Sequence, residues 1–169
     1  MKTTMDEKTL KNLKLAFQGE SEAHFRNVAF AKVADKEGYA QIARLFRAIA
    51  QAESIHSLKM LALRGIVKDT EQNLERSFGT ETFAAEQALP PMIAEAEQVG
   101  DRAAATAFSF SRDVEETHAD LYKKAINDMM SERDNEYHVC TVCGYITDGE
   151  VPERCPICGA KAEMFDKVD

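Results

Sequence analysis

Apolar residues recur at helical spacing over most of the chain, from about Asp6 to Ser131. The pattern breaks near Gly38, Gly65 and Gly100, and glycine suits the left-handed residue that ends a helix. The segments between these breaks predict four helices. The third is expected from about Thr70 to Val99 and the fourth from Asp101 to about Ser131, so the protein should be mainly α, with a helical bundle.

The sequence changes character after the fourth predicted helix. A charged stretch, 132–135, precedes a segment rich in Gly, Pro and Cys with little helical period. At roughly 35 residues this tail is too small to fold on apolar burial alone, so a bound metal or another staple is expected. We therefore predict two domains, a four-helix bundle over 1–134 and a small metal-binding domain over 135–169.

Two copies of one pattern lie within the predicted bundle, and each is a glutamate followed 33 or 34 residues later by Glu-x-x-His. The first copy is Glu20 with Glu53 and His56, and the second is Glu81 with Glu115 and His118. Side chains three residues apart share one helix face, so the carboxylate and the imidazole can reach the same ion. Helical bundles with two metal ions take one Glu from each of two helices and a Glu-x-x-His pair from each of the other two.

The predicted turns allow these residues to meet. Glu20 lies about 15 residues before the first break and Glu53 about 14 after it, so an antiparallel pair returns them to the same height. Glu81 and Glu115 straddle Gly100 in the same way. Chance pairing of Glu and His on a solvated surface is the alternative, and it does not explain two matched sets. Four Glu and two His form a ligand set suited to iron or manganese.

The two halves resemble an internal duplication with one irregularity. The repeat is offset by 61 residues at the first Glu and by 62 afterwards, so the third helix contains one extra residue. Pro90 and Pro91 fall inside this interval. A π-bulge or a proline kink is therefore predicted there.

The cysteine tail carries two Cys-x-x-Cys pairs separated by eleven residues: Cys140, Cys143, Cys155 and Cys158. Two such knuckles place four thiolates tetrahedrally around a single iron or a zinc. The spacing alone leaves both metals open, including a purely structural zinc ribbon. Clustered cysteines favour metal ligation over disulfides in a reducing compartment.

The charge balance narrows the range of partners. The net charge of −8 argues against nucleic acid or an anionic membrane surface, because either would need a basic patch. The first ten residues contain no apolar signal region, and no apolar run approaches the roughly 20 residues that span a bilayer. A cytoplasmic protein is expected.

The duplicated Glu and Glu-x-x-His pattern, followed by Cys-x-x-Cys-Gly-Tyr and Cys-Pro-x-Cys-Gly, resembles the rubrerythrin family over essentially the whole chain. The resemblance implies a ferritin-like bundle with a non-haem di-iron centre and a rubredoxin-like domain with one iron held by four cysteines. It implies that the six Glu and His residues named above are the di-iron ligands, with Glu53 and Glu115 bridging. It also implies reduction of hydrogen peroxide to water in oxidative-stress defence, an upstream electron-donor protein or reductase, and a homodimer in which one subunit's rubredoxin-type iron lies near the other's di-iron centre.

The chain departs from the family pattern at three positions. Ala84 stands where members usually carry a further Glu, three residues after the third-helix ligand. Asn27 and Leu89 replace tyrosines that are usual in the family. Without a carboxylate at position 84, the iron nearest His56 is expected to keep its histidine in both redox states unless water or Glu86 fills the gap.

Two other functions fit the same residues. A ferritin-like bundle oxidises and handles ferrous iron, and a four-carboxylate, two-histidine site without the extra Glu is close to that pattern. A metal-binding bundle fused to a structural zinc ribbon is the third interpretation, with zinc in either site. The four-cysteine domain favours the peroxidase, since a storage protein has little use for an electron-input site.

Overall fold

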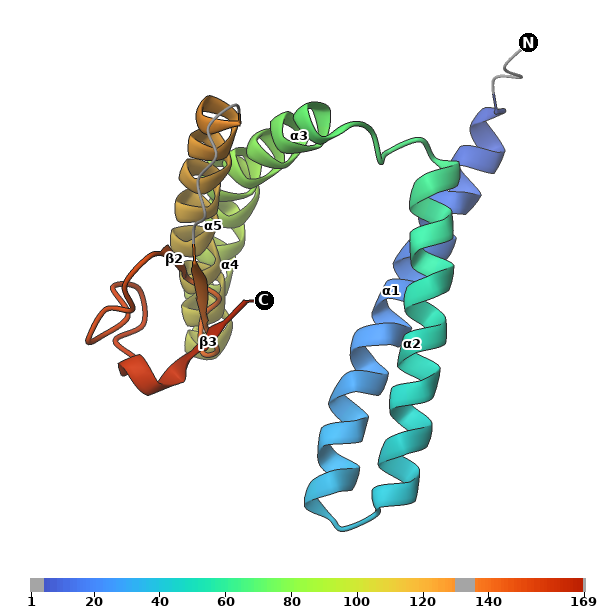
Figure 1. The fold of residues 1–169 in the computed structure, drawn as a ribbon, viewed down its shortest axis with the longest axis horizontal. Coiled ribbons are helices and arrows are strands. Elements are labelled where there is room, and N and C mark those ends of the chain that lie inside the picture. The colour runs from blue at the N-terminus through green and yellow to red at the C-terminus, as the bar shows by residue number, and fades with distance from the viewer. Residues whose placement is uncertain (1–4, 130–135, 169) are drawn as a thin grey trace. The chain divides into compact units, whose positions relative to one another are not determined.

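The computed structural model describes residues 5–129 and 136–168, and the protein is mainly helical. It contains two compact units, Met1–Lys68 and Asp69–Asp169 (Figure 1). The predicted charged stretch at 132–135, and with it the predicted domain boundary, lies outside the described residues. No helix in the described parts of the chain has the length and apolar character needed to cross a membrane.

The first unit is a helical hairpin of α1 (Glu7–Lys36) and α2 (Ala40–Leu63). Asp6 caps α1 by accepting a hydrogen bond from the backbone N–H of Thr9. Gly38 has a φ of +83°, which permits the tight turn at the predicted position. Small side chains allow the two helices to pack closely, and the buried residues of the hairpin are Ala31, Ala34, Ala43, Ala50 and Ser57.

The second unit begins with one long helical stretch that changes its winding part-way. It comprises α3 (Thr70–Phe83), the π-helix η1 (Ala84–Ala88) and α4 (Leu89–Gln98). The π-helix confirms the extra residue inferred from the uneven repeat, and it ends just before Pro90. A π turn absorbs an inserted residue without ending the helix.

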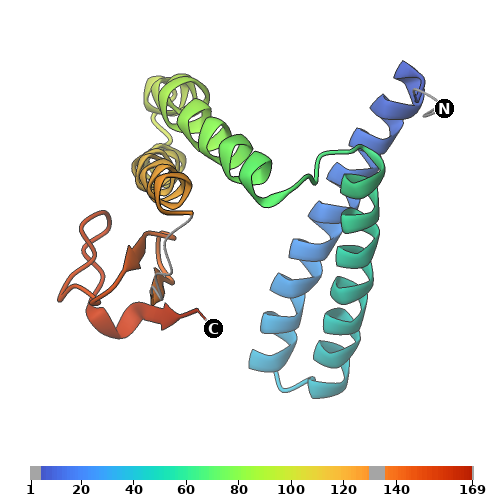
Figure 2. The same ribbon diagram turned by 45° about the horizontal axis from the view of Figure 1, so that its top comes forward.

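The last helix, α5 (Arg102–Asp128), packs along α3 and α4 (Figure 2). Gly100, with φ +76°, ends α4, and Asp101 caps α5 by accepting from the backbone N–H of Ala104. Ile93 and Ala96 of α4 and Val114 and Ala119 of α5 are buried in this part of the unit. The four predicted helices are thus confirmed, the third being divided by the π turn.

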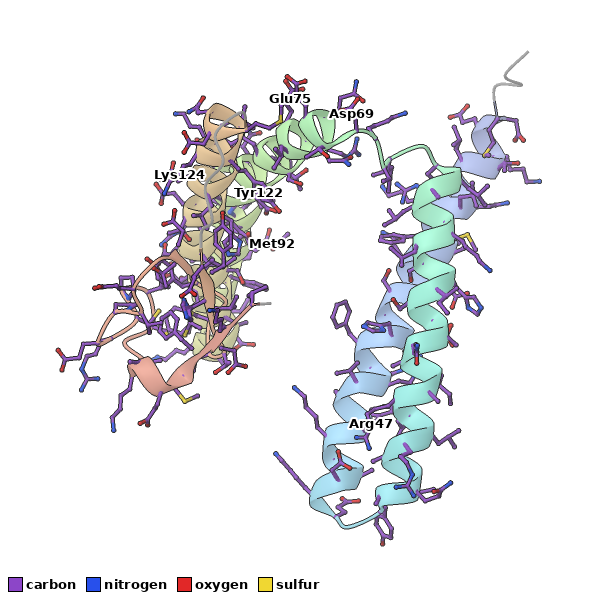
Figure 3. The ribbon with its side chains drawn as sticks, viewed as in Figure 1. Arg47, Asp69, Glu75, Met92, Tyr122 and Lys124 are labelled. Carbon is purple, nitrogen blue, oxygen red and sulfur yellow. The ribbon has the colours of Figure 1, made fainter. Side chains whose placement is uncertain are left out.

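A small antiparallel sheet follows, in the order β2-β1-β3: β1 (Tyr137–Cys140), β2 (Ile146–Asp148) and β3 (Phe165–Lys167). A short 3-10 helix, η2 (Ala162–Met164), precedes β3. The sheet is tied to α5, because Lys124 of α5 (Figure 3) forms an ion pair with Asp148 of β2. The cysteine tail therefore packs on the last helix of its own chain.

Candidate metal centres

The hairpin carries the first group of metal-binding side chains. Glu20 of α1 and Glu53 and His56 of α2 each offer a ligand atom, and these atoms lie within 4.8 Å of one another. His56 Nδ1 is 3.0 Å from Glu53 Oε2 and 3.7 Å from Glu20 Oε2. The structure thus brings together all three residues predicted from the first copy of the motif.

The two carboxyl groups of this cluster, those of Glu20 and Glu53, lie side by side. A hydrogen bond from Glu20, followed by one from His56, lowers the pKa of Glu53. Adjacent carboxylates repel when both are ionised, so one of them must hold a proton or the pair must bind a cation. The clustering of these three ligand atoms therefore suits a bound cation.

The second group lies on α3 and α5. His118 Nδ1 is 3.1 Å from Glu115 Oε2, and the carboxyl groups of Glu81 and Glu115 are hydrogen-bonded to each other. Burial, and then the neighbouring Glu115, raises the pKa of Glu81. This group shares with the hairpin a carboxyl pair and an imidazole whose Nδ1 faces a carboxylate. Of the two groups, however, only the hairpin brings all three ligand atoms within 4.8 Å of one another in the described residues.

The imidazole of His118 also contacts the cysteine tail. Its Nε2 is 3.1 Å from the carbonyl oxygen of Gly144, the residue directly after Cys143. Because a carbonyl only accepts, Nε2 donates this hydrogen bond, and Nδ1 is the ring nitrogen that faces Glu115. Metal-bound histidines usually have such an acceptor behind them, and it fixes the tautomer and the ring orientation.

An apolar groove of about 420 Å³ lies beside His118, between α3, α5 and the sheet. Its walls include Leu74, Leu121, Tyr122 (Figure 3) and Val139. Apolar walls lower the local dielectric, which strengthens the interactions of a charged site next to them. His118, and with it the second group, therefore borders a less polar environment than bulk water.

The four cysteines gather at the two knuckles, as predicted. Two Sγ–Sγ distances are 3.8 Å, between Cys140 and Cys158, and 3.6 Å, between Cys143 and Cys155. A tetrahedral ion with metal–sulfur bonds of about 2.3 Å requires sulfur–sulfur edges of about 3.8 Å. These distances fit one tetrahedral metal.

Burial strongly affects the thiols. Burial raises the pKa of Cys143, and the other three thiols raise it further. Burial also raises the pKa of Cys140, but hydrogen bonds from the backbone N–H groups of Cys143 and Val142 outweigh it and leave the pKa lowered. A metal binds cysteines as thiolates, so each cysteine must lose its proton when the metal binds. The cation then offsets the negative charge of the four thiolates.

Neighbouring residues take supporting positions. His24 is not part of the first cluster, and its ring Nδ1 is 2.8 Å from the carbonyl oxygen of Ala50, one turn before Glu53. Asn27 donates its side-chain amide to the carbonyl of Ala23 within its own helix. The contact between His118 and Gly144 was not predicted, because the knuckle motif gives no signal of the surface on which it packs.

The residues at two family departures lie at the π-helix. Ala84 is its first residue, and Leu89 follows its last. Glu86, which was considered as a replacement carboxylate, is exposed and lines a different surface hollow with Arg112 and Lys123. In the described structure Glu86 is therefore not gathered with Glu81, Glu115 or His118.

The fold and the donor sets define a class of protein: a ferritin-like di-metal protein that also carries a small domain with a four-cysteine metal site. Family models agree, with the rubrerythrin model matching residues 11–126 and the rubredoxin-like domain model of rubrerythrin matching residues 138–166. The chain belongs to the rubrerythrin family.

Individual relatives support the same assignment. Nigerythrin of Nitratidesulfovibrio vulgaris is 38% identical over 93% of this chain and 85% of its own length. Rubrerythrin of Porphyromonas gingivalis is 31% identical over 99% of this chain and 93% of its own length. A solved structure of nigerythrin in a mixed-valence state matches with a TM-score of 0.59 at 36% identity, over 99% of this chain and 89% of that one.

The cofactors of a rubrerythrin-type protein are iron, as a di-iron site and a four-cysteine site, and the donors present fit both. Carboxylate and imidazole ligands suit a pair of iron ions, and four thiolates suit a single one. The prediction for the four-cysteine site is thus narrowed from iron or zinc to iron by family membership, since the sulfur geometry alone suits either metal.

Proposed function

We propose that this protein is a peroxidase that reduces hydrogen peroxide to water with electrons delivered through its rubredoxin-type iron, the one held by the four cysteines. The proposal rests on one observation: the knuckle that would hold this iron is hydrogen-bonded to His118. Two adjacent ferrous ions would supply the two electrons that reduce the O–O bond, and two protons complete two molecules of water. Solved structures of nigerythrin include a fully reduced, all-ferrous state.

Each of the candidate residues has a proposed role. Six residues would hold the iron pair: Glu20, Glu53, His56, Glu81, Glu115 and His118. Four would hold the single iron: Cys140, Cys143, Cys155 and Cys158. We further assign the domains as 1–134 and 135–169. The clustering of Glu20, Glu53 and His56 and the raised pKa of Glu81 beside Glu115 support the assignment of the iron ligands, because a cation would relieve the repulsion between neighbouring carboxylates.

Electrons would reach the iron pair through the first knuckle. Cys143 binds the single iron, Gly144 follows it in the chain, and the Gly144 carbonyl accepts the hydrogen bond from His118 Nε2. This route runs within one chain and so differs from the arrangement expected from the family resemblance, in which the rubredoxin-type iron of one subunit lies near the di-iron centre of the other. The carbonyl of the equivalent glycine in the second knuckle, Gly159, instead accepts a hydrogen bond from Arg154, which belongs to the cysteine tail itself.

The physiological setting follows from the same proposal. An electron-donor protein or reductase supplies the rubredoxin-type iron, and the acidic chain works as a homodimer in the cytoplasm, without nucleic acid or membrane partners. Its role is defence against oxidants. The electron donor, the dimer, the cytoplasmic location and the role in oxidant defence are parts of this proposal, whereas family membership establishes the rubrerythrin type of the protein.

Rapid mixing tests the function directly. Anaerobically reduced protein mixed with peroxide should reoxidise at both iron sites much faster than protein mixed with the same concentration of oxygen. A rate with oxygen equal to or above the rate with peroxide would sink the peroxidase assignment. Visible iron–thiolate absorption of the oxidised protein is required as well, and its absence with bound zinc would favour the structural ribbon.

Ala84 favours a second candidate, oxidation and handling of ferrous iron. The first residue of the π-helix brings no carboxylate toward Glu81, which leaves the simpler ligand set of the ferritin-like proteins. Under this function, ferrous ion added in excess under air would be consumed over many turnovers and retained by the protein. The peroxidase would bind only its own three irons per chain.

A further inference from the structure

The link between the two units is short. α2 ends at Leu63 and α3 begins at Thr70, so seven Cα steps join the helices. Fully extended, they would span at most about 25 Å. The real link is shorter still, because Gly65 N–H and Ile66 N–H bond back to Ala62 and Leu61.

The metal ligands lie far from this link along their helices. Glu53 is ten residues before the end of α2, and Glu81 is eleven residues after the start of α3. At 1.5 Å per residue, these intervals correspond to about 15 Å and about 16 Å. These two distances along the helix axes determine how far the α2–α3 link must reach if Glu53 and Glu81 are to lie at the same level of one bundle.

A ferritin-like bundle has one long crossover connection. In this chain the turns within α1–α2 and α4–α5 are short hairpins, so the crossover must be the α2–α3 link. α2 and α3 then run in the same direction. To bring Glu53 and Glu81 into one layer, the link must climb about 31 Å, the sum of the two heights. Its maximal reach of about 25 Å is insufficient.

The hairpin also needs a covering partner on the face that bears the ligands. Ile42, Leu45 and Ile49 precede Glu53 on this face at spacings of three and four residues, and they are 46%, 55% and 36% exposed. α1 packs along α2 but leaves these three side chains exposed. A matching pair of helices must bury this apolar face.

We propose that a second copy of the chain supplies this cover, so that each di-iron centre combines Glu20, Glu53 and His56 of one chain with Glu81, Glu115 and His118 of another. The inference rests on the proposed function only for the identity of these six ligands. Two chains related by a twofold axis exchange their hairpins, which is a common route to dimers when a connection is too short. Neither chain alone completes a site.

Complementation between two inactive chains tests the exchange. One chain carries Glu53→Ala and His56→Ala, the other carries Glu81→Ala and His118→Ala, and the two bear different affinity tags. In the purified heterodimer, exchange places all six native ligands in one of the two sites. The iron bound outside the four-cysteine sites should be half that of the wild type, while each double variant alone should bind none. No such iron in the heterodimer, or a wild-type monomer that holds an iron pair, would overturn the proposal.

A longer link provides a second test that does not depend on the ligand variants. Inserting about twelve Gly and Ser residues between Ile66 and Val67 gives the chain enough reach to close its own site. Complementation should then fall well below half, while iron in the lengthened wild-type sequence stays. The same insertion at Gly38, in the α1–α2 turn, is the matched control and should leave complementation intact.

These measurements separate the inference from the function. Iron content and molecular mass are measured without peroxide, so a protein that exchanges hairpins but prefers oxygen would lose only the peroxidase assignment. A wild-type protein without an iron pair would refute the di-iron function. In that case the mass alone tests exchange: a dimer that becomes monomeric on lengthening the link supports it, and a dimer that does not change refutes it.

Discussion

At the scale of single residues, two glycines with the same local role differ in their surroundings. Gly144 and Gly159 each follow the second cysteine of a knuckle, with φ of +87° and +74°. Their N–H groups bond in the same way, to the carbonyls of Cys140 and Cys155. Only the carbonyl of Gly144 contacts His118. Substitutions at the two glycines can therefore distinguish an effect on the shape of the knuckle from an effect on its contact with α5.

We expect Gly144→Ala and Gly159→Ala to destabilise the four-cysteine domain similarly, each by about 1 kcal/mol, because alanine is strained at positive φ. Only Gly144→Ala should slow electron transfer from the rubredoxin-type iron to the di-iron site. Stopped-flow absorption at the iron–thiolate band measures this rate. Equal slowing in both variants would show that the Gly144 carbonyl has no special part in the transfer.

A second residue-scale prediction concerns Glu81 in metal-free protein. Its folded pKa is raised above the unfolded value of 4.5 by burial and by Glu115, so its stabilising contribution is complete below about pH 4.5 and is lost as the pH rises through the folded pKa. Glu81→Gln should therefore stabilise the apoprotein at neutral pH, by less than about 1 kcal/mol because solvent screens the site. Thermal unfolding of both apoproteins at pH 4 and pH 7 measures it, and a variant less stable than wild type at pH 7 would contradict the sign.

At the scale of elements, helix ends were the most predictable features. Gly38, Gly65 and Gly100 marked them because positive φ is costly for other residues, and all three adopt it. The uneven repeat also located the π turn, although the prolines drew attention to positions slightly beyond Ala84–Ala88. Packing of the sheet against α5 could not be predicted, since it depends on surfaces that carry no periodic signal.

The cap of α5 offers a direct test of one such end. Asp101 accepts the backbone N–H of Ala104 at 3.0 Å. Asp101→Ala should lower the stability of the second unit by about 1 kcal/mol, whereas Asp101→Asn, which keeps an acceptor oxygen, should lower it by much less. Thermal unfolding followed by circular dichroism distinguishes them. Equal losses would mean that charge at the helix start, rather than the hydrogen bond, stabilises α5.

The π turn sets the rotation of α4 relative to Glu81. Deleting Ala88 should convert η1 to regular α-helix and rotate everything beyond it by about 100° relative to Glu81. Ile93 and Ala96, which are buried in the intact protein, could then no longer face inward together with Glu81. We expect loss of the iron pair with most helix retained, measured by metal analysis and circular dichroism. Ala88→Ser keeps the length and should retain iron, so retained iron in the deletion would show that the turn is dispensable.

At the scale of the whole molecule, the sequence predicts which residues form the site, but it does not predict whether one chain or two chains supply them. Glu20, Glu53 and His56 meet as expected, because positions three apart on a helix and a short hairpin fix their separation. In the second group, Glu115 contacts both His118 and Glu81, but the three ligand atoms are not gathered as closely as those of the hairpin. Whether both groups belong to one chain depends on the reach of the α2–α3 link, which becomes clear only when the helix ends are known.

Removing one cysteine should separate the two halves of the proposed cycle. Cys155→Ser is expected to lose the rubredoxin-type iron and unfold the small sheet, because so few residues need the metal to fold. Chemically reduced variant should still react once with peroxide, but steady turnover with an electron-donor protein should fall to background. Persistent steady turnover would show that electrons reach the di-iron site without the rubredoxin-type iron.

The short link between Leu63 and Thr70 has a consequence for how the protein matures in a cell. If two chains build each iron pair, the rate at which iron sites form is second order in the concentration of newly made protein. The number of complete sites then rises more steeply than the amount of protein when synthesis begins. Under the same condition, dilution of the protein favours separate chains, which have no complete iron site. A chain with one damaged unit still occupies a partner, so a minority of defective copies silences sites on intact ones.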